Sequence, residues 1–176
     1  MILRDKIDAA IRTIPDFPKP GIMFKDITPI LRDPVLVHQI AQEIARQFKG
    51  LGVEVVAGIE SRGFLFGMLV AQELNCSFAI IRKKGKLPHK TVEMEYALEY
   101  GSAIIEMHED EIKAGQKVMI HDDLLATGGT ASAASKLVGQ VGGKIVGFSF
   151  VIGLDFLGGK KLIEQQSSKI VTLINY

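Results

Sequence analysis

The sequence predicts an α/β fold built on a doubly wound parallel sheet, and three observations support that fold class. Short apolar runs rich in β-branched residues alternate with helix-period patterns from residue 34 onward, the order that βαβ units produce. Charged or glycine-rich turns follow several of these runs, where an open parallel sheet has its ligand crevice. A length of 176 residues with 47% apolar content suits one compact domain with a full core.

The overall charge and the cysteine content exclude several classes of protein. A formal net charge of +1 gives no general attraction to nucleic acid or to anionic membranes, so an anion site must come from local clustering. The single cysteine, Cys76, excludes an intrachain disulfide framework and suits a reducing compartment, with its thiol packed in the core. Neither a hydrophobic signal core nor a membrane-spanning run is evident. We therefore expect a cytoplasmic protein without nucleic-acid or membrane partners.

The N-terminal segment predicts a short helix followed by a stiff loop. Apolar residues recur at three- and four-residue steps over residues 3–14, which indicates an amphipathic helix that ends at Pro15. Four prolines lie between residues 15 and 29, so the stretch after the helix is expected to be irregular. An aromatic side chain on this loop, Phe24, either packs at the edge of the core with Phe17 or stacks on a planar base.

The next segments predict a crossover helix and a buried strand that ends in a charged turn. Asp33 and the proline after it begin a helix that continues to the glycine at position 50. Residues 53–59 form an apolar strand, and a second helix follows over residues 64–74. In the turn between them, Arg62 is either a cation that enters the crevice or a charge that is solvated or paired at the helix terminus.

A strand over residues 77–82 leads into a strongly basic segment, residues 82–90. Such a run is commonly a solvated face. This one directly follows an apolar strand, contains glycine and proline, and opens a stretch to Gly101 without clear periodicity. A loop of that length in a compact domain is more often a functional lid than a plain connection.

A strand that begins at Lys117 carries the strongest chemical signal in the chain. It ends in two adjacent carboxylates, Asp122 and Asp123, and a Thr-Gly-Gly-Thr loop that closes at Thr130 follows. Glycines at positions 128 and 129 are expected to take positive φ values and to form a nest of N–H donors that binds a phosphate. The carboxylates would repel a bare anion, so they require sugar hydroxyls or magnesium between them and the phosphate. The alternative is an acidic strand end before an ordinary turn.

The remaining segments complete the alternation of strands and helices. After an alternating strand over residues 102–108 and the phosphate-loop segment, a small-residue helix covers residues 131–141. A buried strand follows over 144–154, then a loop with a short helix to 166, and a last strand over 169–175. The histidines lack mutual metal-ligand spacing, which argues against a zinc site. They are His38, His89, His108 and His121.

The segment D-D-L-L-A-T-G-G-T resembles the 5-phosphoribosyl diphosphate (PRPP) signature of type I phosphoribosyltransferases. The resemblance implies that Asp122 and Asp123 hold the ribose and that the loop after them holds the 5′-phosphate. The implied phosphate-binding residues are Ala126, Thr127, Gly128, Gly129 and Thr130. The segment G-I-E-S-R-G-F is similar to the pyrophosphate loop of the family, which implies a catalytic and pyrophosphate-binding role for Arg62. Glu60 stands where some members have Asp, and no separate role is expected for it.

The segment F-P-K-P-G-I-M-F-K-D-I-T-P resembles the base-recognition segment of those family members that use adenine. The resemblance implies adenine contacts from Met23, Phe24 and Lys25, mostly through main-chain groups that pair with the edge of the purine. It also implies that Leu154 closes the base pocket. The preceding residue departs from the family pattern, because Gly153 stands where a glutamate is expected.

The basic segment and its end also resemble the family. The ending A-L-E-Y-G is similar to the L-E-Y-G sequence of the lid, which implies that Glu99 is the general acid or base. Without the resemblance, Glu93, Glu95 and Glu99 could not be distinguished. Pyrophosphate contacts are expected from the basic residues at the start of the lid, with a catalytic role for Lys86 as well. These residues are Arg82, Lys83 and Lys86.

The resemblance implies a purine-salvage enzyme that transfers the 5-phosphoribosyl group of PRPP to adenine, giving AMP and pyrophosphate. Magnesium is expected to be carried by PRPP near the two acids, without direct metal ligands. We expect one domain over residues 1–176, with a hood at 1–33, a flexible lid at 82–101 and a homodimeric assembly. The alternatives are a transferase for another purine base and a non-catalytic regulator that senses PRPP or nucleotides.

Overall fold

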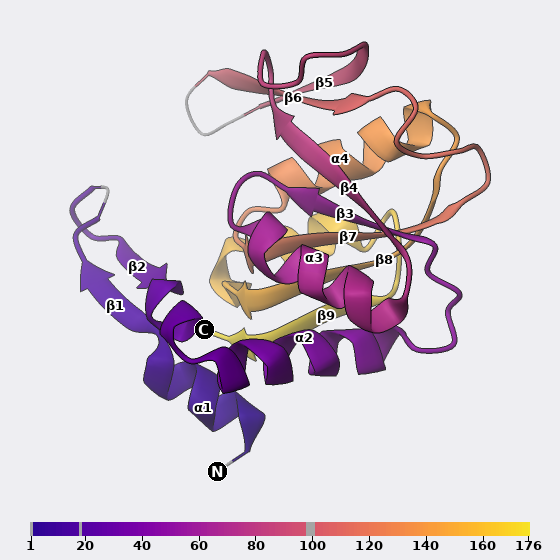
Figure 1. The fold of residues 1–176 in the computed structure, drawn as a ribbon. Coiled ribbons are helices and arrows are strands. Elements are labelled where there is room, and N and C mark those ends of the chain that lie inside the picture. The colour runs from indigo at the N-terminus through magenta and orange to yellow at the C-terminus, as the bar shows by residue number, and fades with distance from the viewer. Residues whose placement is uncertain (1, 18, 98–100) are drawn as a thin grey trace.

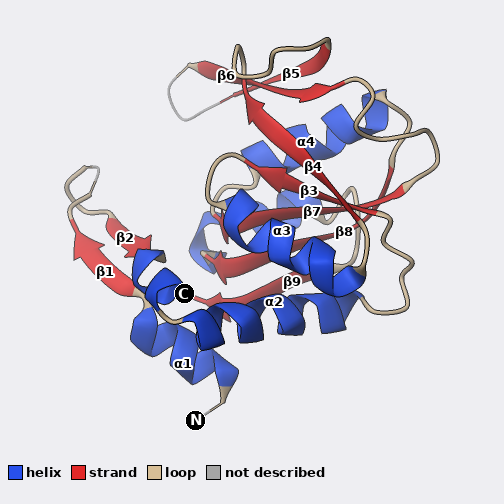
Figure 2. Ribbon diagram, in the orientation of Figure 1, coloured by secondary structure: helices blue, strands red, loops and turns tan. Residues whose placement is uncertain are grey.

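The structure, a computed structural model, describes residues 2–17, 19–97 and 101–176. A seven-stranded sheet forms its centre, with strand order β5-β6-β4-β3-β7-β8-β9 (Figures 1 and 2). The strands of this sheet are β3 (Val55–Ile59), β4 (Ser77–Lys83), β5 (Thr91–Ala97), β6 (Ser102–His108), β7 (Lys117–Leu125), β8 (Lys144–Gly153) and β9 (Ile170–Asn175). The helices are α1 (Leu3–Ala10), α2 (Pro34–Phe48), α3 (Gly63–Leu74), α4 (Gly129–Gln140) and α5 (Gly159–Ile163).

The predicted parallel sheet is confirmed for five of these strands, because β4, β3, β7, β8 and β9 pair in parallel. At the other edge, β6 pairs antiparallel with β4, and β5 pairs antiparallel with β6. The expectation of irregular chain from 82 to 101 is therefore wrong for β5. Its alternating sequence explains the strand, since Val92, Met94 and Tyr96 pack on the core while Glu93 and Glu95 lie between them.

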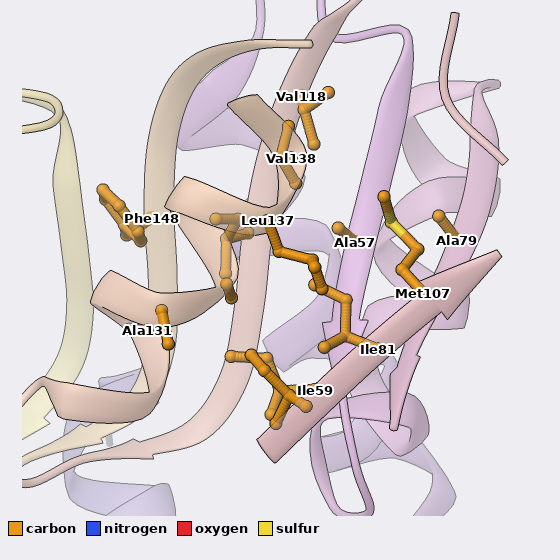
Figure 3. Packing of buried hydrophobic residues seen from close by; sticks show 14 of the residues in the cluster. Ala57, Ile59, Ala79, Ile81, Met107, Val118, Ala131, Leu137, Val138 and Phe148 are labelled. Atoms are coloured by element: carbon orange, nitrogen blue, oxygen red, sulfur yellow. The ribbon is translucent and has the colours of Figure 1, made fainter. Parts of the chain in front are cut away.

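Helices cover both faces of the sheet, and each face has its own apolar core. On one face, Leu137 and Val138 of α4 pack over strand residues such as Ile81 and Phe148 (Figure 3). On the other face, α2 and α3 pack against the sheet through a second buried cluster. Burial of each large apolar side chain contributes about 1.5–3 kcal/mol, so the two layers together stabilise the sheet that carries the site.

The N-terminal segment differs from its prediction. Helix α1 ends at Ala10, and β1 (Arg12–Pro15) pairs antiparallel with β2 (Met23–Asp26) in a separate hairpin. A 3₁₀ segment, η1 (Thr28–Arg32), then leads to α2. The expectation of a helix to residue 14 and of an irregular loop after it is wrong, because cross-strand pairing of Ile14 with Phe24 overrides the local pattern.

Several local expectations are confirmed. Asp33 caps α2, and its Oδ1 accepts hydrogen bonds of 3.0 Å from the amides of Val35 and Leu36. Cys76 is a free thiol, half-buried beside the core cluster that underlies α2 and α3. Within the described ranges, every helix is too short or too polar to cross a membrane.

Candidate active site

The strand-end residues converge on one cavity. A hollow of about 200 Å³ is lined by Arg62 at the start of α3, by Asp122 and Asp123 on β7, and by the loop from Ala126 to Thr130 that leads into α4. A larger hollow of about 480 Å³ lies between α1, α2 and β9, and its lining does not include these residues. The smaller cavity is at the carboxyl ends of the parallel strands, where α/β sheets bind their ligands.

The two acids lie within β7, which continues to Leu125 and therefore ends two residues later than predicted. Asp123 is buried, with 3% of its surface exposed, and its Oδ2 accepts a hydrogen bond of 2.5 Å from Arg62 Nε. Asp122 Oδ1 accepts from the Asp123 amide at 2.8 Å. A Cβ on Gly63 would lie 2.8 Å from the His121 carbonyl oxygen, so this glycine lets the N-terminus of α3 approach the acids.

Burial raises the pKa of the Asp122 carboxyl well above its usual range, and the charge of Asp123 adds to the shift. The opposite charge of Arg62 moderates the effect. A raised pKa means that folding makes ionised Asp122 less favourable than in the unfolded chain. The site thus retains a carboxylate pair at some loss of stability, which is common where acids serve binding or catalysis.

We expect Asp122→Asn to raise the melting temperature at pH 7.5 by about 2–4 °C, the change that about 1 kcal/mol gives in a domain of this size. The native carboxyl binds protons more tightly than the unfolded one, so the native state of the unsubstituted protein loses stability as pH rises from the unfolded pKa to the raised one. The gain in the variant should therefore disappear near pH 4. Calorimetric scans across pH would measure it, and a lower melting temperature at pH 7.5 would contradict the raised pKa.

The glycine-rich loop leads directly into the N-terminus of α4. Gly128 has a φ of +81° and is the N-cap residue, while the first amides of α4 have no intrahelical acceptor and can donate to an anion. Thr127 is exposed, and Thr130 Oγ1 lies 3.4 Å from the hydroxyl of Tyr96. The expected positive φ is confirmed for Gly128 and is wrong for Gly129, which is the first helical residue of α4.

The loop is held from behind by backbone contact with α5. A Cβ on Gly128 would lie 2.7 Å from the carbonyl oxygen of Gly159, and a Cβ on Gly159 would lie 2.2 Å from that of Ala126. The two backbones therefore touch without intervening side chains. The role of Gly159 was not predicted, although the Gly-Gly pair at 158 and 159 was a signal for close backbone approach.

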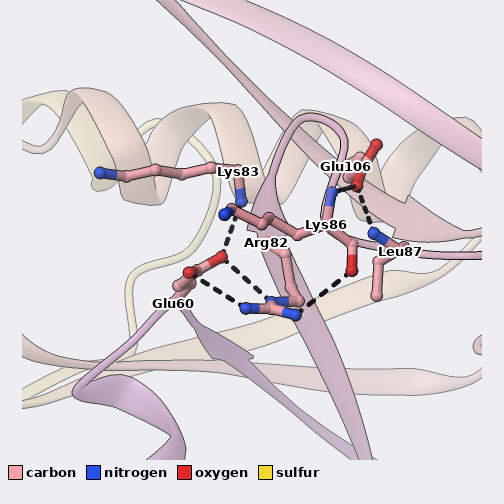
Figure 4. A network of polar contacts seen from close by, with 6 residues as sticks. All are labelled: Glu60, Arg82, Lys83, Lys86, Leu87 and Glu106. Carbon is pink, nitrogen blue, oxygen red and sulfur yellow. Dashed lines mark hydrogen bonds and ion pairs between the residues drawn. The ribbon is translucent and has the colours of Figure 1, made fainter.

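Two of the predicted cations, Arg62 and Arg82, form ion pairs with carboxylates. Arg62 forms the ion pair with Asp123, and its guanidinium carbon lies 5.9 Å from the centre of the Phe24 ring. Arg82 donates to both oxygens of Glu60 at 3.1 and 3.2 Å, and the amide of Lys83 donates to Glu60 at 3.0 Å (Figure 4). Arg82 also donates to the carbonyl of Lys86 at 3.3 Å.

Glu60, for which no role was expected, organises this basic segment. Burial raises the pKa of its carboxyl, but hydrogen bonds from Arg82 and from the Lys83 amide outweigh it and bring the pKa below its usual range. A carboxylate two residues before Arg62, at the end of a buried strand, was the sequence signal for a partner of the basic run. Glu60 thereby joins the turn after β3 to the end of β4.

The residues expected to read a base lie on and beside the β1–β2 hairpin. Met23 is exposed, and Phe24 meets Phe17 edge-on with ring centres 5.1 Å apart. Lys25 Nζ donates to Thr13 Oγ1 at 3.0 Å and lies 3.7 Å from the centre of the Tyr176 ring. The ammonium group of Lys25 is thus engaged by Thr13 and Tyr176.

The remaining predicted positions are Leu154, Gly153 and Glu99. The amide of Leu154 donates to the Leu125 carbonyl at 2.8 Å, which connects the two strand ends. A Cβ on Gly153 would lie 2.6 Å from Asn175 Oδ1, so the glutamate expected there would require the Asn175 side chain to move. Glu99 lies outside the described residues.

His121, which directly precedes the acids, is a buried structural residue. Its Nδ1 lies 2.8 Å from Ser149 Oγ, and burial lowers its pKa to about 3. The ring is therefore neutral at ordinary pH and cannot exchange protons with a substrate there.

Known proteins resemble this chain over nearly its full length. Residues 26–173 match the phosphoribosyl transferase domain family. The chain is 53% identical over 175 residues to an adenine phosphoribosyltransferase of Cytophaga hutchinsonii, covering 99% of this chain and 97% of that protein. The crystal structure of the adenine phosphoribosyltransferase from Thermoanaerobacter pseudethanolicus superposes with a TM-score of 0.94 at 44% identity, covering 98% of this chain and 99% of that one. The Saccharomyces cerevisiae adenine phosphoribosyltransferase, solved with an imino-altritol bisphosphate and adenine, has a TM-score of 0.89 at 36% identity, covering 97% and 98% of the two chains.

Proposed function

The chain belongs to the adenine phosphoribosyltransferase family of phosphoribosyltransferases, and from that premise we propose how its residues carry the reaction. The protein is a purine-salvage enzyme that transfers the 5-phosphoribosyl group of PRPP to adenine, giving AMP and pyrophosphate. The observation that carries the proposal is the single cavity shared by Arg62, the two acids of β7 and the phosphate loop. In this proposal Arg62 binds the pyrophosphate leaving group of PRPP, the two acids bind its ribose, and the loop binds its 5′-phosphate.

The phosphate loop serves as the anchor of the substrate. The amides at the start of α4 and the hydroxyls of Thr127 and Thr130 bind the 5′-phosphate, together with the backbone from Ala126 to Gly129. This end of PRPP does not react. Its binding energy therefore positions C1′ of the ribose for attack.

The acids and the cations act on the two sides of the bond that breaks. As the bond from C1′ to pyrophosphate breaks, the electron pair leaves with pyrophosphate and positive charge develops on the ribose. Asp122 and Asp123 accept hydrogen bonds from the ribose hydroxyls and favour that positive charge. Arg62 and Lys86, with Arg82 and Lys83, stabilise the departing pyrophosphate. Arg62 exchanges its partner Asp123 for the substrate, or bridges the two.

We propose that magnesium enters with PRPP as part of the substrate. Asp122 and Asp123 are hard oxygen donors of the kind that magnesium prefers, but Asp123 is already paired with Arg62. Among the residues that the structure describes, no group of three or more His, Cys, Asp or Glu side chains could hold a metal ion. The donor set thus suits a metal that the substrate carries and that the two acids adjoin.

The base is bound between the hairpin and the end of β8. The face of Phe24 packs on adenine, the main chain of Met23 and Lys25 pairs with its edge, and Leu154 closes the pocket. N9 of adenine attacks C1′, and Glu99 takes or relays the proton that N9 loses. Yeast and Giardia lamblia relatives were solved with adenine and 9-deazaadenine, which supports a purine pocket in this family.

The assay that tests this function supplies PRPP and magnesium with adenine, hypoxanthine, guanine or xanthine, and measures both pyrophosphate and nucleotide. We expect AMP with adenine and rates at least about 100-fold lower with the other bases, because a site built to pair with one polar edge leaves its groups unpaired with another. Product with a different base would identify another purine transferase. No product with any base would support the sensing regulator.

We propose that the protein works as a cytoplasmic homodimer of one-domain subunits over residues 1–176, with residues 1–33 as the hood and 82–101 as the lid. The continuous family match over residues 26–173 supports one domain. On the outer face of α3, Leu65 and Met68 are 43% and 49% exposed, which suits a surface covered by a second subunit. Light scattering at assay concentration tests the assembly, and a monomeric mass would exclude the dimer.

A further inference from the structure

Glu106 is a buried carboxylate on β6 that has no place in the chemistry proposed above. Only 3% of its surface is exposed. Its Oε1 accepts hydrogen bonds from the amides of Lys86 and Leu87, both at 2.8 Å (Figure 4). Burial alone would raise the pKa of this carboxyl, yet the backbone amides of the turn lower it, so the group is held as a carboxylate. A buried charge of this kind fixes the geometry of the groups that donate to it.

The turn that Glu106 holds carries Lys86, the proposed pyrophosphate contact. The turn bends at Gly85, where φ is +82°. The amide of Lys86 donates to Glu106, and its carbonyl accepts from Arg82, which Glu60 holds in place. The amide and the carbonyl of Lys86 are thus held by charged side chains from β6 and β4.

The side chain of Lys86 is directed away from the buried carboxylate. In Figure 4 it extends from the turn toward the side on which Glu60 lies, as Lys83 also does. Its charge is close enough to Glu60 to contribute to the lowered pKa of that carboxyl. Glu106 therefore acts on the backbone of Lys86 and does not engage its ammonium group.

Stability alone gives no reason for a charge at this position. A neutral acceptor could also pair with the amides of Lys86 and Leu87, whereas an apolar residue would leave them unpaired and cost stability. A flexible basic turn, however, would have to lose conformational freedom each time its lysine met the substrate. A carboxylate that receives two amides orders the turn before binding.

We propose that Glu106 is a positioning residue that orders the turn so that Lys86 meets the pyrophosphate group of PRPP. The inference rests on the proposed role of Lys86 in the transferase reaction. It assigns to Glu106 no contact with the substrate.

A double-mutant cycle tests this inference with Lys86→Ala, Glu106→Leu and the two combined. We expect each single variant to raise the KM for PRPP about 10-fold and to leave the KM for adenine within about twofold. The combined variant should resemble Lys86→Ala, because Glu106 has nothing left to position. Glu109→Gln, at an exposed carboxylate just after β6, is the matched control and should leave both constants unchanged.

The outcomes separate this inference from the proposed function. A combined effect near 100-fold, or an equal loss for adenine and PRPP, would assign Glu106 a structural role and overturn the inference. If Lys86→Ala has no effect while the unsubstituted enzyme turns over, the inference fails and the transferase function stands. If Glu106→Leu does not fold, Glu106→Gln replaces it in the cycle. We then expect about a threefold rise in the KM for PRPP that disappears beside Lys86→Ala, and an unchanged KM overturns the inference.

Discussion

Asp123→Asn should lower kcat/KM for PRPP by at least about 100-fold, the scale of losing one preorganised electrostatic contact in an active site. Asp123 is buried and holds Arg62 through a 2.5 Å hydrogen bond, so in the proposed mechanism its charge serves both the ribose and the pyrophosphate side of the cavity. The amide that replaces it removes the negative charge facing the developing positive ribose. It also leaves the Arg62 guanidinium without its ion pair. Initial rates of pyrophosphate release over a range of PRPP concentrations measure the loss.

The control for this variant is Asp110→Asn, at an exposed acid in the turn after β6. It removes the same charge from the protein and should keep kcat/KM within about twofold, because exposed charges are screened by solvent and salt. Circular dichroism of both variants checks that the fold is retained. Turnover of Asp123→Asn close to that of the unsubstituted enzyme would exclude the assigned role.

Gly128→Ala should also lower kcat/KM for PRPP by at least about 100-fold, mainly through a higher KM. A side chain at a φ of +81° costs about 1–2 kcal/mol, and the added Cβ would lie 2.7 Å from the Gly159 carbonyl oxygen. That oxygen belongs to backbone and cannot rotate away. The loop must therefore shift, and displacing a binding group by about 1 Å can cost about 100-fold. Steady-state kinetics with PRPP as the varied substrate measure the effect.

Gly139→Ala is the matched control at the opposite end of the same helix. No atom lies within 4 Å of its added Cβ, so α4 accepts the methyl group without movement. Alanine is also the better helix former, which should stabilise the protein by up to about 1 kcal/mol without changing its kinetics. If both variants bind PRPP equally well, the cradle does not depend on the backbone conformation of Gly128.

The parallel part of the fold could be predicted from the sequence because its signals are local. Residues that are close in the chain determine the apolar runs of β3 and β8 and the helix cap at Asp33. The β1–β2 hairpin could not be predicted, because prolines dominate its local pattern while its pairing depends on residues that are eight to fourteen positions apart. The strand β5 was missed although it alternates, since the basic run before it favoured a loop.

The part of the candidate site that could be predicted consists of residues that are adjacent in the sequence and whose types suggest a particular ligand. Two adjacent acids before a glycine-rich loop are recognisable in the sequence alone, and in the structure the acids and the loop line the same cavity. The partners of the cations could not be predicted, because Glu60 and Glu106 reach the basic segment only after β3, β4 and β6 pair side by side. In sequence they resemble any strand-end or strand carboxylate. The contact between Gly128 and Gly159 likewise depends on how α5 returns to the sheet.

The short pairing between β4 and β6 divides the sheet into two parts that we expect to open with different free energies. The ladder between these strands is short: Arg82 pairs with Glu106 and Lys83 with Ile105, and the Lys84 amide donates to the Ile104 carbonyl at 3.0 Å, while β6 pairs along its length with β5. The β5–β6 unit can thus open as a sub-global unit without breaking the ladder of the parallel strands. Amide exchange in this unit should then report a lower opening free energy than exchange in β3 or β7. The basic turn is thus attached to the short ladder at the sheet edge, whereas the glycine-rich loop follows β7 in the middle of the parallel strands.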